Sequence, residues 1–325
     1  MILYRLILLC CLCSICVNAA TMLTKYAKAQ INDIDPDTTC LQEPHKTICN
    51  LENVEWIEGI VAKKIQYIIE IKDSVLLKHR YFELQPNNLN FEGYNLTALI
   101  PTSILCIEKS TLNTNKNQKN IPTHIECTLK SNLYHIVVHA NFITTHPMYN
   151  EANTILEARI MEHEKLEQPL KQQDNETWQK DYKITIKQAT IWIKSTSLNQ
   201  VLFDLYKREQ RIATDLKPQN DMDYLAKQDS IATKDYLDFL NKYNNMLVNF
   251  NIQADISQQN KQALAKALNK FISIATKPNQ NLSLTIKGDD NLVLTLDELD
   301  GFLAIDTTFF DVIIKILKHA QMQIA

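Results

Sequence analysis

Glycine is scarce in this chain, whose 325 residues include only Gly59, Gly93, Gly288 and Gly301. An average protein contains about 7% glycine. Glycine supplies the positive-φ turns and the close backbone approaches that bound phosphate groups require. Neither G-x-G-x-x-G nor G-x-x-x-x-G-K-[ST] can be written from these four positions, which argues against a nucleotide-binding loop.

The chain also lacks a basic stripe. It has 34 Lys and Arg against 37 Asp and Glu, with both signs interspersed and a net charge of −3. A nucleic-acid-binding protein normally carries clustered positive charge, so we expect no nucleic-acid partner. No segment after the N-terminus approaches 18 apolar residues, so we expect no transmembrane segment in the mature chain.

The N-terminus has the pattern of a secretory signal. Arg5 precedes a run of twelve residues, 6–17, that is apolar except for one serine, and Val17-Asn18-Ala19 resembles a cleavage site. A twelve-residue helix is about 18 Å long, too short for a bilayer core of roughly 30 Å. We therefore predict that residues 1–19 are a cleaved signal peptide, cut near Ala19, and that the protein is periplasmic or secreted.

Four of the eight cysteines fall inside this signal. A lipoprotein signal would place a small residue directly before the acylated cysteine, and none of the four has one. We interpret them as small apolar residues of a discarded helix.

The other four cysteines remain in the mature chain, and an even number in an exported protein indicates two disulfides. Cys40 and Cys49 flank a polar loop, and Cys106 and Cys127 lie on two β-like runs around another loop. We predict the pairs Cys40–Cys49 and Cys106–Cys127. A zinc site would need C-x2-C or C-x4-C spacing, which these cysteines lack.

Residues 38–146 have the alternation of β-strands. In KKIQYIIEIKD, for example, Ile65, Tyr67, Ile69 and Ile71 share one parity. Successive runs of this kind are separated by polar turns, which predicts an antiparallel meander with disulfide-pinned hairpins.

The composition then changes. We predict a disulfide-bearing β-rich part over residues 20–165, a linker over 166–180 around Pro169, and a helix-rich α+β part over 181–325. KITIKQATIWIK is expected to be a strand with a bulge near Gln188, because its apolar parity switches there. Three stretches with i, i+3/i+4 apolar spacing follow, at 198–212, 236–250 and 264–272.

At the C-terminus we expect a hairpin that turns at Gly288-Asp289-Asp290, a capping box between Thr295 and Glu298, and a last helix that begins at Asp306. The predicted fold class is α+β: an antiparallel sheet followed by amphipathic helices that pack on a sheet.

Two patterns could suggest a metal site. His135 and His139 in HIVVH have i, i+4 spacing, but Ile136 stands where H-E-x-x-H requires Glu, and on a strand the two would lie about 13 Å apart. LDELDG weakly resembles a calcium loop, yet a loop beginning at Asp297 would put Leu299 and Gly301 at ligand positions. We predict no metal ligands and no cofactor.

Paired acids are the remaining catalytic candidates. Asp235 with Asp238, and Glu162 with Glu164, lie on charged helical stretches, where a solvated face is the usual role. No serine has a G-x-S-x-G elbow, and no unpaired cysteine is left as a nucleophile. We therefore assign no catalytic residue.

Aromatic side chains are frequent on the β-like stretches: Tyr67, Tyr81, Phe82, Phe91, Phe142 and Trp192. Most such residues form a core. The functional alternative is a groove between sheet and helices that holds an apolar chain or a partner segment.

The last 55 or so residues, around Phe271, Pro278, Leu282, Leu284, Leu294 and Leu296, resemble a segment of the AsmA-like, lipid-handling periplasmic proteins of Gram-negative bacteria. The similarity is one of layout and apolar spacing. The chain is much shorter than those proteins and lacks their retained N-terminal anchor. The resemblance implies a place in the cell envelope and contact with lipid or an envelope protein, and it transfers no catalytic residue.

We therefore expect an exported, non-catalytic protein that binds an apolar ligand (lipid) or an envelope partner. A secreted adhesin or assembly factor is the alternative. A hydrolase with a site assembled from dispersed Asp, Glu and His ranks third.

Overall fold

A computed structural model gives the structure of the chain. It describes residues 27–28, 38–43, 45–57, 60–73, 75–87, 89–91, 94–111, 120–145, 183–213, 233–252, 256–295, 298 and 309–325. The predicted signal peptide, the predicted linker and the start of the last helix at Asp306 lie outside these residues.

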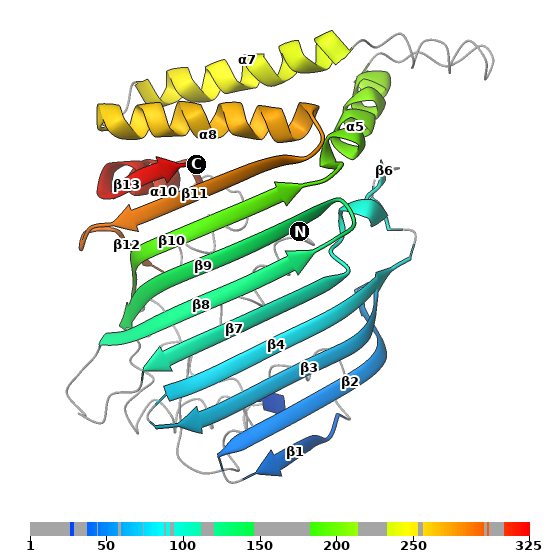
Figure 1. Cartoon of the computed structure of the whole chain (residues 1–325), viewed down its shortest axis with the longest axis vertical. Helices are drawn as coiled ribbons and strands as arrows, with labels where there is room; N and C mark the ends of the chain where they lie inside the picture. The colour runs from blue at the N-terminus through cyan, green and yellow to red at the C-terminus, as the bar shows by residue number, and fades with distance from the viewer. Residues whose placement is uncertain are drawn as a thin grey trace, which may run out of the picture.

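The centre of the molecule is one 11-stranded antiparallel sheet (Figure 1). Its strand order is β1-β2-β3-β4-β7-β8-β9-β10-β11-β13, and β12 also pairs with β10. The strands are β1 (Cys40–Glu43), β2 (Lys46–Ile57), β3 (Ile60–Lys72), β4 (Val75–Pro86), β7 (Ser103–Thr111), β8 (Asn120–Lys130), β9 (Tyr134–Thr145), β10 (Lys183–Ser195), β11 (Gln280–Gly288), β12 (Val293–Thr295) and β13 (Ala320–Ile324).

Smaller elements complete the fold. β5 (Asn90–Phe91) and β6 (Tyr94–Asn95) form a separate two-stranded sheet, followed by the 3-10 turn η1 (Thr97–Leu99). The helices are α5 (Leu198–Ala213), α7 (Thr233–Ile252), α8 (Gln258–Thr276) and α10 (Phe309–His319). They lie at the C-terminal end of the sheet (Figure 1), and α8 contacts α5, α7, β11 and β13.

Alternating burial explains why these segments pair as strands. Along β3 and β4, buried residues such as Ile65, Ile69 and Phe82 alternate with partly exposed ones. We call the side with these buried residues the covered face and the other side the open face. One-sided packing of this kind is common in antiparallel sheets. Ala27, in the helical pair 27–28, is completely buried in the cluster on the covered face.

The meander predicted over residues 38–146 is confirmed, since neighbouring strands from β1 to β9 follow one another in the chain. The sheet then continues into the predicted helix-rich part, because β9 pairs with β10 from Lys183↔Thr145 to Ser195↔Tyr134. The register of this pair shifts between Ile186 and Gln188, where a bulge was expected. The three predicted helical stretches correspond to α5, α7 and α8.

The predicted C-terminal hairpin is wrong. β11 and β12 both pair antiparallel with β10, one after the other, so they run in the same direction along it. The residues between them form a short loop, in which the Asp289 carboxylate accepts hydrogen bonds from the backbone N–H groups of Asn291 and Leu292. The bulge in β10 brings the Ile186 carbonyl oxygen so close to Gly288 that a Cβ there would lie 2.1 Å from it. On its other side, β11 pairs antiparallel with β13.

The capping box is confirmed. Thr295 N–H donates to the Glu298 carboxylate at 2.8 Å, and Glu298 N–H donates to Thr295 Oγ1 at 3.2 Å. Lys315 of α10 also donates to both carboxylate oxygens of Glu298, at 2.6 and 2.9 Å. The capping box is thereby attached to the last helix.

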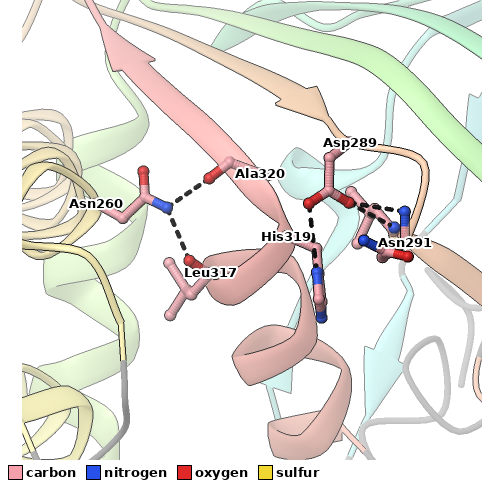
Figure 2. Close-up of polar contacts among 7 residues, drawn as sticks. Asn260, Asp289, Asn291, Leu317, His319 and Ala320 are labelled. Atoms are coloured by element: carbon pink, nitrogen blue, oxygen red, sulfur yellow. Dashed lines mark hydrogen bonds and ion pairs between the residues drawn. The ribbon is translucent and has the colours of Figure 1, made fainter.

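Side chains of α8 cover the outer edge of β13. Figure 2 shows the Asn260 amide between two backbone carbonyls: its Nδ2 donates to Leu317 O at 2.7 Å and to Ala320 O. Asn260 Oδ1 accepts from Met322 N–H at 3.1 Å, and Lys266 donates to Ile324 O at 2.9 Å. These bonds occupy polar backbone groups that an edge strand would otherwise offer to another chain.

Candidate functional site on the open face of the sheet

Both disulfides lie on the covered face. Cys40 is directly opposite Cys49, and Cys106 is directly opposite Cys127, with Cα–Cα distances of 4.3 and 4.1 Å. The structure thus contains the two pairs that the sequence predicts. A single row of paired residues crosses the sheet through both: Cys40, Cys49, Tyr67, Arg80, Cys106, Cys127 and Val138. The disulfides therefore join neighbouring strands within the core cluster.

Three charged side chains are buried beside this row. Lys78 Nζ lies 3.1 Å from Glu108 Oε1, and Arg80 Nη2 lies 3.8 Å from Glu108 Oε2, with all three side chains at most 4% exposed. Arg80 also lies over the Tyr67 ring, 5.6 Å from its centroid. Charges removed from water need such partners, since desolvation of an ion costs several kcal/mol. Because the group is enclosed in the core, we assign it a structural role.

The open face carries an unexpected apolar band. The solvent-exposed face of an antiparallel sheet usually carries polar residues, because apolar and polar residues alternate along each strand. Here two adjacent rows of paired positions carry aliphatic and aromatic side chains, all partly exposed, among polar ones such as His79 and Glu126 in one row and Gln66 and Thr128 in the other. We name these residues the open-face band: Ile48, Ile68 and Ile107 in one row, and Tyr81, Leu105, Val137 and Trp192 in the other.

Charged rows border the band on both sides. One border includes Lys46, Glu70, Lys109 and His124, and the other includes Lys64, Glu83, Lys130 and Lys194. An apolar surface with a polar rim marks a ligand site or an interaction surface more often than it marks ordinary solvent-exposed sheet. The band is therefore our candidate site.

A positively charged group lies at the β8–β10 end of the band. His135 is directly opposite Lys130 on one side and Lys194 on the other. Its ring packs edge-on against Trp192, with centroids 5.4 Å apart. Burial, together with the charges of Lys130 and Lys194, lowers the pKa of His135, so the ring is neutral near pH 7.

The histidines that the sequence analysis considered as zinc ligands both lie on the open face but in different surroundings. His135 belongs to the basic group, and His139 faces Glu126 and packs edge-on with His124 at 6.3 Å. His146 lies outside the described residues. Within the described part of the chain, no group of three or more His, Cys, Asp or Glu side chains could hold a metal ion.

The other sequence candidates do not meet at a site. Asp235 and Asp238 are exposed on α7, and Glu162 and Glu164 lie outside the described residues. In the segment compared with a calcium loop, Glu298 is the described residue and belongs to the capping box.

The aromatic residues divide between the two faces. Tyr67 and Phe82 are buried on the covered face, and Phe142 packs against the same cluster. Tyr81 and Trp192 belong to the open-face band. Parity along each strand separates Tyr81 from Phe82, but the band itself appears only when the register of several strands is known.

Comparison with protein-family models, curated proteins and solved structures finds no match to the chain. In the part of the chain that the structure describes, no helix has the length and apolar character needed to cross a membrane. The two disulfides fit a protein that folds in an oxidising compartment outside the cytoplasm.

Proposed function

We propose that this is an exported binding protein that holds an apolar ligand, a lipid, on the open-face band. The observation that carries the proposal is the apolar band with charged rows on both sides, on a face whose side chains are partly exposed. Burial of such a surface against an acyl chain is favourable by about 25 cal/mol for each Å² removed from water.

The export route is part of this proposal. The N-terminal pattern supports a signal peptide cut near Ala19, and the disulfides support an oxidising destination, the periplasm or the cell exterior. N-terminal sequencing of the exported protein tests the cleavage. A mature chain that starts near residue 20 supports it, and a chain that retains Met1 contradicts it.

The ligand proposal is tested by purification without detergent, followed by lipid extraction and mass spectrometry. We expect lipid to co-purify with the wild-type chain and to be lost from a Leu105→Lys/Val137→Lys variant, because both lysines would put charge in the centre of the band. Leu237→Lys is the matched control, since Leu237 is an exposed apolar residue on α7, away from the band.

Circular dichroism should first show that all three proteins are folded. Lipid that is retained equally by wild type and the band variant would contradict the proposal. A wild-type chain that carries no lipid and takes up none when mixed with lipid vesicles would contradict it as well. If the wild type captures a protein partner that the band variant does not, the occupant of the band is an envelope protein and the lipid proposal is wrong.

A further inference from the structure

The basic group at one end of the open-face band consists of Lys130, His135 and Lys194, on three neighbouring strands. Directly opposite residues of antiparallel strands have Cβ atoms about 5 Å apart, so like charges in one row repel each other. The next positions in the same row are Ser103 beyond Lys130 and Asn281 beyond Lys194, which are neutral. The row therefore places three basic side chains together, and the nearest acidic residue in line is Glu83, on the far side of Ser103.

The two lysines are exposed, and neither forms an ion pair with any residue that the structure describes. The His135 ring between them is partly buried, and its Nε2 has no hydrogen-bond partner among the described side chains and backbone. A buried polar atom without a partner destabilises the fold. An anion bound at this position would neutralise both lysines beside the His135 ring.

We infer that the open-face band selects a lipid with an anionic headgroup, which Lys130, His135 and Lys194 bind while the acyl chain lies along the band past Trp192. This inference rests on the proposed function, and it adds the charge and the orientation of the ligand. The T-shaped contact of His135 with Trp192 joins the basic group to the apolar surface.

The dimensions of the band fit this occupant. The band runs from Trp192 on β10 to Ile48 on β2, six strand spacings of about 4.8 Å each, or roughly 30 Å. One leaflet of a bilayer has acyl chains that span about half of a 30 Å hydrocarbon core. A single long acyl chain of about 15 Å therefore covers about half of the band's length, with its headgroup at the β8–β10 end.

The experiment compares two probes with the same chain and different charge: stearate and its methyl ester. Binding of each is measured by isothermal titration calorimetry on the full chain, on a Lys130→Glu/Lys194→Glu variant and on a Lys64→Glu/Lys109→Glu control. The control reverses two lysines on the borders of the band, away from the basic group.

For the wild type, we expect stearate to bind about tenfold more tightly than the ester, since two partly exposed charge contacts are each worth up to about 1 kcal/mol. Reversal of Lys130 and Lys194 should remove this preference and leave ester binding unchanged. The control should keep the preference.

The outcomes separate the two proposals. Equal binding of stearate and ester by the wild type overturns the anionic headgroup and leaves apolar binding intact. If the preference for stearate persists in Lys130→Glu/Lys194→Glu and is lost in Lys64→Glu/Lys109→Glu, the proposed position of the headgroup is wrong. Binding of neither probe overturns the proposed function itself.

Discussion

We expect the stability of the sheet to depend strongly on the charge of Glu108. Glu108→Gln leaves Lys78 and Arg80 buried without the carboxylate that faces them at 3.1 and 3.8 Å. Removal of one partner of a buried ion pair typically costs 3–5 kcal/mol, so urea unfolding should show a loss of about 4 kcal/mol in the free energy of unfolding.

Glu126→Gln is the matched control for this prediction. Glu126 lies on the adjacent strand β8, is exposed on the open face and has His139 opposite. Surface substitutions of this kind usually change stability by less than about 0.5 kcal/mol. Equal effects of the two variants would contradict the structural role of the buried charges.

Single residues also show what the sequence could and could not predict. The parity of Ile65, Tyr67 and Ile69 was readable because a strand alternates with a period of two. Lys78 and Glu108 share the buried parity of their own strands, yet their ion pair depends on the register of β4 with β7. Hydrophobicity alone assigns such charged residues to the surface.

At the scale of elements, Asn260 is the contact that holds β13 to α8. Asn260→Leu keeps a similar volume but removes the partners of Leu317 O, Ala320 O and Met322 N–H (Figure 2). Buried backbone groups left without partners cost about 1–3 kcal/mol each, and with partial relaxation we expect a total loss near 3 kcal/mol.

Hydrogen exchange checks this prediction at the level of the strand. The amides of β13 and of β11 beside it should show the largest increase in exchange in Asn260→Leu, whereas those of β3 and β4 should exchange faster only as far as global unfolding becomes easier. Gln262→Ala, a change at an exposed position of the same helix, serves as the control. Unchanged exchange in β13 would show that Asn260 does not hold this strand.

The ion pair between Glu298 and Lys315 predicts a pH dependence. Burial of Glu298 acts to raise its pKa, but the hydrogen bonds and charge of Lys315 and the Thr295 N–H outweigh it, so the pKa is lowered from its ordinary 4.5. A carboxyl with a lowered folded-state pKa contributes stability above the unfolded pKa, and this contribution is lost as the pH falls through the folded value.

Because the ion pair is partly exposed, Lys315→Met should lower the free energy of unfolding by about 0.5–1 kcal/mol near pH 7. The loss should become progressively smaller below about pH 4. The measurement is urea unfolding of wild type and variant across this range. Lys318→Met, on an exposed position of the same helix, should have no such pH-dependent effect. A difference that stays constant from pH 7 to pH 3 would contradict the pairing.

Elements were predictable where the signal is local. The bulge near Gln188 follows from a parity switch, and the capping box follows from Thr295 and Glu298. The end-to-end arrangement of β11 and β12 was missed because Gly288-Asp289-Asp290 has turn residues that fit a hairpin equally well. β13 is short and follows a helix directly, so its five residues carry little strand signal by themselves.

At the scale of the whole molecule, the sheet is continuous across β9 and β10 (Figure 1). We therefore expect the β-rich and helix-rich parts to unfold together. In a Trp56→Phe/Trp178→Phe background, denaturation followed by far-UV circular dichroism and by the fluorescence of Trp192 should give coincident transitions, and Glu108→Gln and Asn260→Leu should each shift both probes. Two separated transitions would contradict this coupling.

The open-face band is also a property of the whole molecule, since its residues come from six strands and no local motif contains it. From the sequence, a groove between sheet and helices was the functional alternative to a filled core. The helices lie at the β10–β13 end of the sheet (Figure 1). The apolar band lies on the open face of the sheet itself. Only the register of the complete sheet brings Tyr81, Leu105, Val137 and Trp192 into one row.

The most direct measurement of the central claim is quenching of Trp192 by a brominated acyl chain, which requires contact. Trp56 and Trp178 are replaced by Phe so that Trp192 is the sole reporter, and 9,10-dibromostearate is titrated into the chain. A Leu237→Trp reporter on α7, with all three natural tryptophans replaced by Phe, provides the control. We predict saturable quenching of Trp192 and none of the control. Quenching of the α7 reporter alone, or of neither, would contradict lipid binding on the open face.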